Sequence, residues 1–392
     1  MIVRKGEEMI YVVVRQSPFY HQMTLEEFLF GKDIPHRVLR KNETNTRTYE
    51  VERVSDRFSS LCDIGLMIKK LVDFNEKTKN LHEVDRKSLY REFYIPKKSG
   101  GLRKIDAPNT SLMVALTELK AIFEDNYDCL YHTSAFAYIK KRSTLDSIKR
   151  HQENQSKWFA KYDFSNFFGS TTPEFVYHML SMIYPFSSIM EDEVGCEALK
   201  TALDLAFLDG GLPQGTPLSP MLTNVVMIPI DFQLARTFRD FRCNDKQVRC
   251  VYTRYADDIL ISSKFDFDFR KVEDMIRAVL KYYNAPFVMK PEKTRYGSSS
   301  GSNWNLGVML NKDNKITIGY RKKKIFSAML SSYCMDRIKG NPWDIHDVQV
   351  LEGHRNYYRM VEGEDIDGLV KHVGDKYNMD IPKAIEEDLK AV

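Results

Sequence analysis

The stretch Val251–Ser263, VYTRYADDILISS, carries two adjacent carboxylates between two apolar segments. Apolar and β-branched residues lead into Tyr255-Ala256-Asp257-Asp258 and resume at Ile259, a pattern that predicts a β-hairpin with both carboxylates at its tight turn. Side chains at a turn can project from one end of the hairpin, so Asp257 and Asp258 would repel each other unless a cation or solvent intervenes. The stretch therefore predicts a divalent-metal site, although Asp-Asp is also ordinary turn chemistry.

A third carboxylate stands near the end of another apolar segment. The sequence Trp158 to Phe164, WFAKYDF, predicts a strand with Asp163 near its end, and Phe167-Phe168-Gly169 follow. Three acids at the ends of apolar strands can hold two hard, oxygen-seeking ions, as phosphoryl-transfer enzymes do to stabilise the attacking and leaving oxygens. The third acid therefore favours the metal site over turn chemistry.

Three sequence blocks together resemble the palm of a reverse transcriptase. They are Asp163, the loop Gly211–Pro220 (GLPQGTPLSP) and Tyr255-Ala256-Asp257-Asp258, in the order and spacing of that family. The resemblance extends from about Tyr90 to Gly363 and implies an α+β right-hand polymerase with fingers, a palm containing an antiparallel sheet, and a helical thumb. We expect an N-terminal extension over 1–88, fingers over 89–162, a palm with an interleaved fingers segment over 163–318, and a thumb over 319–392.

The resemblance also implies site residues. Asp163 and Asp257 would be the principal ligands of two Mg²⁺ ions, with Asp258 nearby and the backbone carbonyl of Phe164 assisting. The incoming nucleotide would contact basic groups of the fingers, an aromatic ring under its sugar, a loop amide, and a lysine able to protonate pyrophosphate; these residues are Lys97, Lys98, Arg103, Phe168, Gln214 and Lys293.

The nucleotide-contacting residues have alternative interpretations. Residues 91–108 predict a strand, a Gly-Gly turn and a second strand, which would bring Lys97 or Lys98 near Arg103, but a solvated basic hairpin has the same pattern. A ring at Phe168 would exclude a 2′-hydroxyl, whereas Phe167 and Phe168 could both be core residues. Because alternate side chains of a strand face opposite ways, we expect one of these two rings to be core.

Two basic stretches lie outside the predicted catalytic residues. With a net charge of only +4, their positive charge is concentrated on chosen faces and suits a nucleic-acid backbone, although a solvated helix face is the alternative. The first stretch comprises Lys140, Lys141 and Arg142 with Lys149 and Arg150, and the second comprises Arg321, Lys322, Lys323 and Lys324.

The branch of the family is harder to define. Retron reverse transcriptases carry Asn-Ala-x-x-His and Val-Thr-Gly, where this chain has Ser147–His151 and Asn305-Leu306-Gly307, so His151 and Gly307 match. We expect a compact retron-like or anti-phage-defence enzyme that copies a dedicated structured non-coding RNA into nascent DNA from dNTPs. An effector protein or a second copy of the chain is a further candidate partner. The alternatives are a true retron enzyme making msDNA, a non-enzymatic RNA-binding scaffold, an RNA polymerase, and an untemplated terminal transferase.

Composition and periodicity complete the expectations. The 392 residues are 43% hydrophobic, enough for a sizeable core, and the six cysteines show no Cys-x-x-Cys pair, which favours reduced thiols in the cytoplasm. The apolar run Ile10–Val14 is too short to span a bilayer, so no membrane partner is expected. Helices are predicted at Thr24–Phe30, at Leu61–Phe74, after a cap at Thr171 or Thr172, from Ser219, over Arg270–Tyr283, and from Tyr320 onward.

Overall fold

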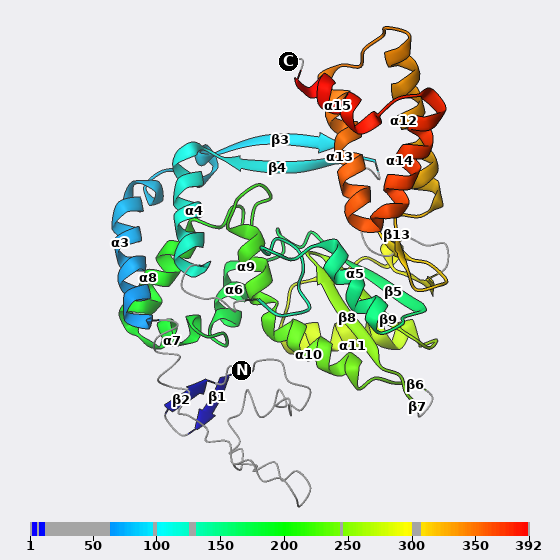
Figure 1. Cartoon of the computed structure of the whole chain (residues 1–392). Coiled ribbons are helices and arrows are strands. Elements are labelled where there is room, and N and C mark those ends of the chain that lie inside the picture. Colours follow the sequence, from blue (N-terminus) through cyan, green and yellow to red (C-terminus); the bar gives the residue numbers. More distant parts are fainter. Residues whose placement is uncertain are drawn as a thin grey trace, which may run out of the picture. The chain divides into compact units, whose positions relative to one another are not determined.

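The structure is a computed structural model that describes residues 2–5, 8–11, 63–96, 100–124, 131–243, 246–299 and 307–390 (Figure 1). The predicted helix at Thr24–Phe30 and the basic residues Lys97 and Lys98 lie outside these residues. The chain divides into two compact units, each built from segments that are distant in sequence. The first unit comprises Met1–His132, Asn166–Gln233 and Ala278–Phe287, and the second comprises Thr133–Ser165, Leu234–Arg277 and Val288–Val392.

Helices dominate the first unit. They are α3 (Ile64–His82), α4 (Thr110–Glu124), α6 (Pro173–Leu180), α7 (Phe186–Glu191), α8 (Glu193–Asp204) and α9 (Ser219–Val226), with the short η1 (Arg86–Leu89). Helix α3 contacts α4, α7 and α8, and the side chains of Phe74, Leu116 and Leu199 are almost completely buried. This helical packing stabilises the unit through apolar burial.

The local signals at two of these helices are confirmed. The Thr172 side chain accepts a hydrogen bond of 3.3 Å from the Phe175 N–H, and Pro173 opens helix α6. Helix α9 starts at Ser219 as predicted. Pro229 interrupts the helical path, because α9 ends at Val226 and a new helix, α10 (Ile228–Arg239), begins two residues later.

The first unit also contains the predicted glycine-turn hairpin, β3 (Tyr90–Pro96) and β4 (Leu102–Pro108). Gly100 and Gly101 at its turn have φ values of 86° and 78°, which glycine adopts without strain. In the antiparallel register Arg103 lies opposite Ile95. The hairpin prediction is therefore confirmed for the residues that the structure describes.

An antiparallel sheet is the centre of the second unit. Its strands follow the order β10 (Val288–Met289), β5 (Trp158–Ser165), β9 (Asp258–Ser263), β8 (Cys250–Tyr255), and β11 (Arg295–Ser298) also pairs with β5. Helix α5 (Thr144–Glu153) packs on β8 and contributes Ile148 to a buried cluster with Phe159 and Leu260. The predicted hairpin of Val251–Ser263 is β8 and β9, and the α+β class with an antiparallel sheet is confirmed.

Four helices of the second unit gather into one bundle in Figure 1: α12 (Tyr320–Ile338), α13 (Ile345–Glu362), α14 (Glu364–Tyr377) and α15 (Ile381–Lys390). Their core includes Phe326, Leu330, Leu351 and Ile366, all at most 1% exposed. Helix α12 begins at Tyr320 as predicted. Tyr357 of α13 packs against this core and also against the Ile148 cluster, so one side chain links the bundle to the sheet.

The remaining elements are short or join the larger ones. They are β1 (Ile2–Lys5), β2 (Glu8–Tyr11), β6 (Arg242–Cys243), β7 (Lys246–Gln247), β12 (Met309–Leu310), β13 (Ile316–Thr317), η2 (Pro291–Lys293) and α11 (Phe269–Tyr282). The predicted helix at Arg270–Tyr283 is α11, shifted by one residue. Within the described ranges, no helix is both long and apolar enough to cross a membrane.

Candidate active site

Asp258 opens strand β9 and has a pairing neighbour on each side. In the sheet register it lies opposite Asp163 on β5 and opposite Tyr255 on β8. The turn therefore contains Ala256 and Asp257 alone, and the prediction that both aspartates lie in the turn is wrong for Asp258. Ala256 has a φ of 56°, the left-handed conformation that two-residue hairpin turns favour. Like charges directly opposite each other destabilise a sheet, so the pairing of Asp163 with Asp258 demands a compensating cation.

Asp257 is partly buried, although its place in a turn predicts exposure. Its carbonyl accepts a hydrogen bond of 3.1 Å from the Phe164 N–H, which fixes the turn to the end of β5. Burial raises the pKa of Asp257, and the charges of Asp258 and Asp163 raise it further. Burial also raises the pKa of Asp258, with Lys161 opposing the shift and Asp163 adding to it. We call these three neighbouring carboxylates, Asp163, Asp257 and Asp258, the acid cluster.

Three lysines contact the acid cluster. Lys161 Nζ lies 2.8 Å from Asp258 Oδ2, and the Nζ atoms of Lys290 and Lys293 lie 3.0 and 2.9 Å from Asp163 oxygens. The family motif indicated Lys293 alone. Lys161 could have been found, because residues two apart on a strand share a face and Lys161 precedes Asp163 by two. Lys290 could not, because its position depends on the pairing of β10 with β5.

The donor chemistry of the acid cluster fits magnesium. Carboxylates are hard oxygen ligands of the kind that Mg²⁺ selects, and burial together with neighbouring carboxylates disfavours the charged forms of Asp257 and Asp258, which a bound cation would stabilise. In the part of the chain that the structure describes, no three His, Cys, Asp or Glu side chains are close enough together to hold a metal ion. Both oxygens of Asp163 instead contact lysine ammonium groups.

Phe167 and Phe168 lie in a turn and not on a strand. Strand β5 ends at Ser165, and Asn166 has a φ of 46°. The two rings therefore do not alternate along a strand, and that part of the expectation is wrong. Phe167 is nevertheless core, with its ring centroid 4.8 Å from that of Phe287, whereas Phe168 is only half-buried. The Phe168 carbonyl accepts a hydrogen bond of 3.1 Å from the Leu212 N–H, which joins this turn to the Gly211–Pro220 loop.

Gln214 belongs to the same loop and lies against the glycine-turn hairpin. Its carbonyl accepts a hydrogen bond of 2.8 Å from the Asp106 N–H of β4, and its side chain is partly exposed. Gly215 has a φ of 124°, and a Cβ there would lie 2.8 Å from the Asp106 carbonyl oxygen, so only glycine fits this approach. Arg103 is exposed on β4. The first unit therefore brings Phe168, Gln214 and the hairpin together through backbone contacts.

The two basic stretches are not uniformly available to a ligand. Arg142 donates to the Ala135 carbonyl at 2.7 Å, and the Arg150 guanidinium stacks on Phe136, whereas Lys140 and Lys141 are exposed. In the second stretch, Lys322 donates to the Gly307 carbonyl at 2.7 Å and Lys323 pairs with the buried Glu362, whereas Arg321 and Lys324 are exposed. About half of the predicted nucleic-acid contacts thus have roles within the chain.

The residues that match the retron motifs have structural partners. His151 is completely buried and contacts Ser262 Oγ at 2.5 Å and Thr253 Oγ1 at 2.8 Å, which ties α5 to strands β8 and β9. Burial lowers the pKa of His151 to about 3, so its ring is neutral. Gly307 has a φ of 100°, and a Cβ there would lie 2.4 Å from Lys322 Nζ. Both residues therefore support the architecture around the site.

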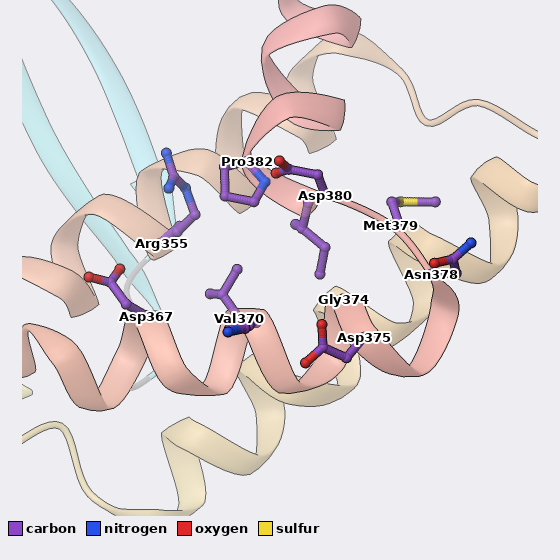
Figure 2. Close-up of a pocket in the computed structure, with 11 residues that line it drawn as sticks. Arg355, Asp367, Val370, Gly374, Asp375, Asn378, Met379, Asp380 and Pro382 are labelled. Atoms are coloured by element: carbon purple, nitrogen blue, oxygen red, sulfur yellow. The ribbon is translucent and has the colours of Figure 1, made fainter.

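A separate cavity lies among helices α13, α14 and α15, with a volume of about 540 Å³ (Figure 2). Arg355, Asp367, Asp375 and Asp380 contribute charges of both signs to its wall. Two of the lining charges are paired within the bundle, Arg355 with Glu352 and Asp367 with Arg359. It shares no residue with the acid cluster, so we place the candidate active site at the carboxylates and not at this cavity.

Several known proteins are similar to this chain in sequence. The Ec73 retron reverse transcriptase of Escherichia coli is 27% identical to this chain over 215 residues, which cover 54% of this chain and 65% of that protein. The Ec83 retron reverse transcriptase of Escherichia coli is 23% identical, over 76% of this chain and 91% of that protein. The Mx162 retron reverse transcriptase of Myxococcus xanthus is 25% identical, over 84% of this chain and 68% of that protein.

Residues 95–317 match the family described as reverse transcriptase (RNA-dependent DNA polymerase). The matched range contains all of the acid cluster, the three lysines that contact it, and the Gly211–Pro220 loop. It covers more than half of the sequence. The chain therefore belongs to the reverse transcriptase family.

Proposed function

We propose that this protein is an RNA-directed DNA polymerase that extends a primer with deoxynucleotides on an RNA template. The observation that carries the proposal is the acid cluster, in which the sheet register sets Asp163 opposite Asp258 and the turn adds Asp257. A fold that keeps three neighbouring carboxylates at a shared strand end accepts a cost in stability. That cost is explained if the acid cluster binds the divalent ions of a polymerase.

The residues of the acid cluster take defined roles in this proposal. Asp163 and Asp257 hold two Mg²⁺ ions, with Asp258 and the Phe164 carbonyl as supporting ligands. When bound, the ions supply the positive charge that acidifies a primer 3′-hydroxyl and neutralises a triphosphate. Lys293 gives a proton to pyrophosphate, a role that its positive charge and half-exposed side chain support.

The residues of the first unit act on the nucleotide. Arg103, with Lys97 and Lys98, binds the triphosphate, because a guanidinium fork and ammonium charges match phosphate oxygens. Gln214 contacts the incoming nucleotide. Phe168 excludes a 2′-hydroxyl by its bulk, and its half-buried ring supports this role better than the buried ring of Phe167 does.

A primer-extension assay tests the polymerase proposal against its alternatives. The protein should extend an annealed primer on an RNA template with dNTPs, in a reaction that EDTA stops. Extension without a template would indicate a terminal transferase, and a preference for ribonucleotides would indicate an RNA polymerase. RNA binding without any extension would indicate a non-enzymatic scaffold.

We further propose a retron-like cytoplasmic enzyme with a dedicated structured RNA, in an anti-phage defence system. The names of the three relatives support a retron-type branch and make a true retron enzyme, which produces msDNA, the close alternative. The exposed cations Lys140, Lys141, Arg321 and Lys324 are candidates for the RNA backbone. Nucleic acid that copurifies with the protein should contain one discrete RNA, with attached or accompanying DNA if the enzyme acts on it. A heterogeneous mixture would contradict a dedicated template.

A further inference from the structure

Lys290 and Lys293 contact the same carboxylate but are held differently. Lys290 is anchored beside Asp163 twice, since its N–H donates to the Asp163 carbonyl at 2.9 Å and its Nζ lies 3.0 Å from Oδ1. Lys293 follows in the short turn η2, and its Nζ contacts both carboxylate oxygens, at 3.0 and 2.9 Å. The Lys293 side chain is 48% exposed, against 26% for Lys290. Because its side chain is more exposed, Lys293 can leave the carboxylate for solvent more readily than Lys290 can.

The Lys293 ammonium also acts beyond Asp163. Its charge lowers the pKa of Asp257 and of Asp258, opposing the effect of burial on both groups. Together, Lys161, Lys290 and Lys293 supply three positive charges to three carboxylates. The acid cluster is thus accompanied by an equal number of cations from the chain itself, with Lys293 bridging both oxygens of the carboxylate that faces Asp258 across the sheet.

We propose that Lys293 is an internal counter-ion that occupies the cation position of the acid cluster in the metal-free protein and leaves Asp163 when a divalent ion binds. Lys290 stays beside Asp163 throughout and acts as a fixed positioning residue. This inference rests on the proposed function, because it requires that the acid cluster binds a divalent ion. An ammonium group that bridges both oxygens of a carboxylate and a divalent ion at the same carboxylate repel each other, so binding of the ion disfavours this contact of Lys293.

If a divalent ion displaces Lys293, this residue should weaken metal binding and yet assist primer extension. The Lys293 ammonium competes with the metal in the resting protein, and once released it is available to donate a proton during turnover. Lys293→Gln should therefore bind Mn²⁺ roughly tenfold more tightly, since it removes a competing unit charge from the site, yet extend primers more slowly. Lys293→Arg keeps the charge and should bind Mn²⁺ within about twofold of the wild type. A merely structural lysine would lower metal affinity and activity together.

Lysine acylation measured by mass spectrometry observes the displacement in the wild-type protein. A small amine-reactive ester, used with and without Mn²⁺, should label Lys293 severalfold faster when Mn²⁺ is bound. Labelling of Lys290 should stay unchanged. The exposed Lys339, at the end of α12, reports any general effect of Mn²⁺ on the reagent, and Lys339→Gln controls for net charge in the affinity measurement.

The outcomes separate this inference from the function on which it rests. Suppose that the wild type binds Mn²⁺, but Mn²⁺ does not speed the labelling of Lys293 and Lys293→Gln does not bind Mn²⁺ more tightly. The counter-ion role is then wrong, while the polymerase proposal stands. If the wild type binds no Mn²⁺ at millimolar concentration, the proposed function fails first. Faster labelling of Lys293 together with tighter Mn²⁺ binding by Lys293→Gln supports the displacement.

Discussion

Carboxylates in the acid cluster and carboxylates in the helical bundle are in opposite electrostatic situations. In the bundle, Glu352 accepts two hydrogen bonds from Arg355, at 2.6 and 2.7 Å, and this pairing lowers the pKa of Glu352. Lys390 likewise lowers the pKa of Glu386. In the acid cluster, burial and neighbouring like charges raise the pKa of Asp257 and of Asp258.

The difference shows where the fold stabilises the charged form of a carboxylate and where it disfavours that form. A lowered carboxyl pKa means that the fold stabilises the charged form, and such a group contributes to stability. A raised pKa means that the fold disfavours the charged form, and such a group is maintained for another reason. Neighbouring residues elsewhere in the chain also differ in burial, as Phe167 does from Phe168 and Lys323 from Arg321.

The largest effect is expected at Asp257. Asp257→Asn should lower primer extension by at least about a hundredfold, the scale of losing one precisely placed electrostatic group. It should leave the fold intact, because the substitution preserves volume and removes a charge that burial disfavours. Primer extension and thermal melting should be measured on the same preparation. Retained extension would exclude the metal role, and a collapsed melting transition would make Asp257 a structural residue.

The two phenylalanines after β5 should have different roles, Phe168 in the choice of sugar and Phe167 in stability. Phe168→Ala should raise ribonucleotide incorporation relative to deoxynucleotide incorporation by about 10- to 200-fold, the usual range for filling or opening a small steric site. Phe167→Ala should leave sugar choice unchanged and destabilise the protein by about 3–5 kcal/mol, because its ring is 3% exposed. Competition between paired nucleotides and urea unfolding measure these effects. An exchange of the two phenotypes would assign the sugar contact to Phe167.

The basic residues at the start of α12 should differ in function, some contributing to RNA retention and others to stability. The double variant Arg321→Glu, Lys324→Glu reverses two exposed cations and should weaken RNA retention and reduce its salt dependence, while sparing extension on excess generic primer and template. Lys323→Gln breaks the pair with Glu362 and should lower the melting temperature with little effect on retention. Filter binding across a salt series distinguishes them. Equal loss of retention in both variants would contradict the division.

The smallest effect is expected within the bundle. Glu352→Gln should cost less than about 1 kcal/mol at neutral pH, because the pair with Arg355 joins residues three apart on one helix and glutamine keeps the volume and a hydrogen-bond acceptor. The pKa of Glu352 is lowered in the folded state, so its contribution is present above the unfolded pKa and is lost as pH falls through the folded value. The wild type and the variant should therefore converge in unfolding free energy as the pH falls through the folded pKa of Glu352. A difference that stays constant from neutral to acid pH would show that charge is not the cause.

The sequence predicts local elements better than the contacts between them. Alternating apolar residues around Tyr255–Asp258, the glycines at 100 and 101 and the cap at Thr172 each encode their structure within a few residues, and each element forms as predicted. The contact of Lys290 with Asp163 depends on strand pairing across 127 residues, which no local pattern states. The turn at Phe167 depends on Asn166 leaving the strand conformation. The inward direction of Lys323 depends on a buried glutamate 39 positions later.

The most direct test of the central claim is the effect of Mg²⁺ on the stability of the wild type and of Asp257→Asn, each melted in EDTA and in excess Mg²⁺. A ligand that binds only the folded state stabilises it by about 2.7 kcal/mol at 100 times its Kd. We expect the wild type to melt at a higher temperature in Mg²⁺ than in EDTA, and Asp257→Asn to gain little, because it lacks the charge that the ion neutralises. An equal gain in both proteins would mean that Mg²⁺ binds elsewhere, and the acid cluster would lose its place as the metal site.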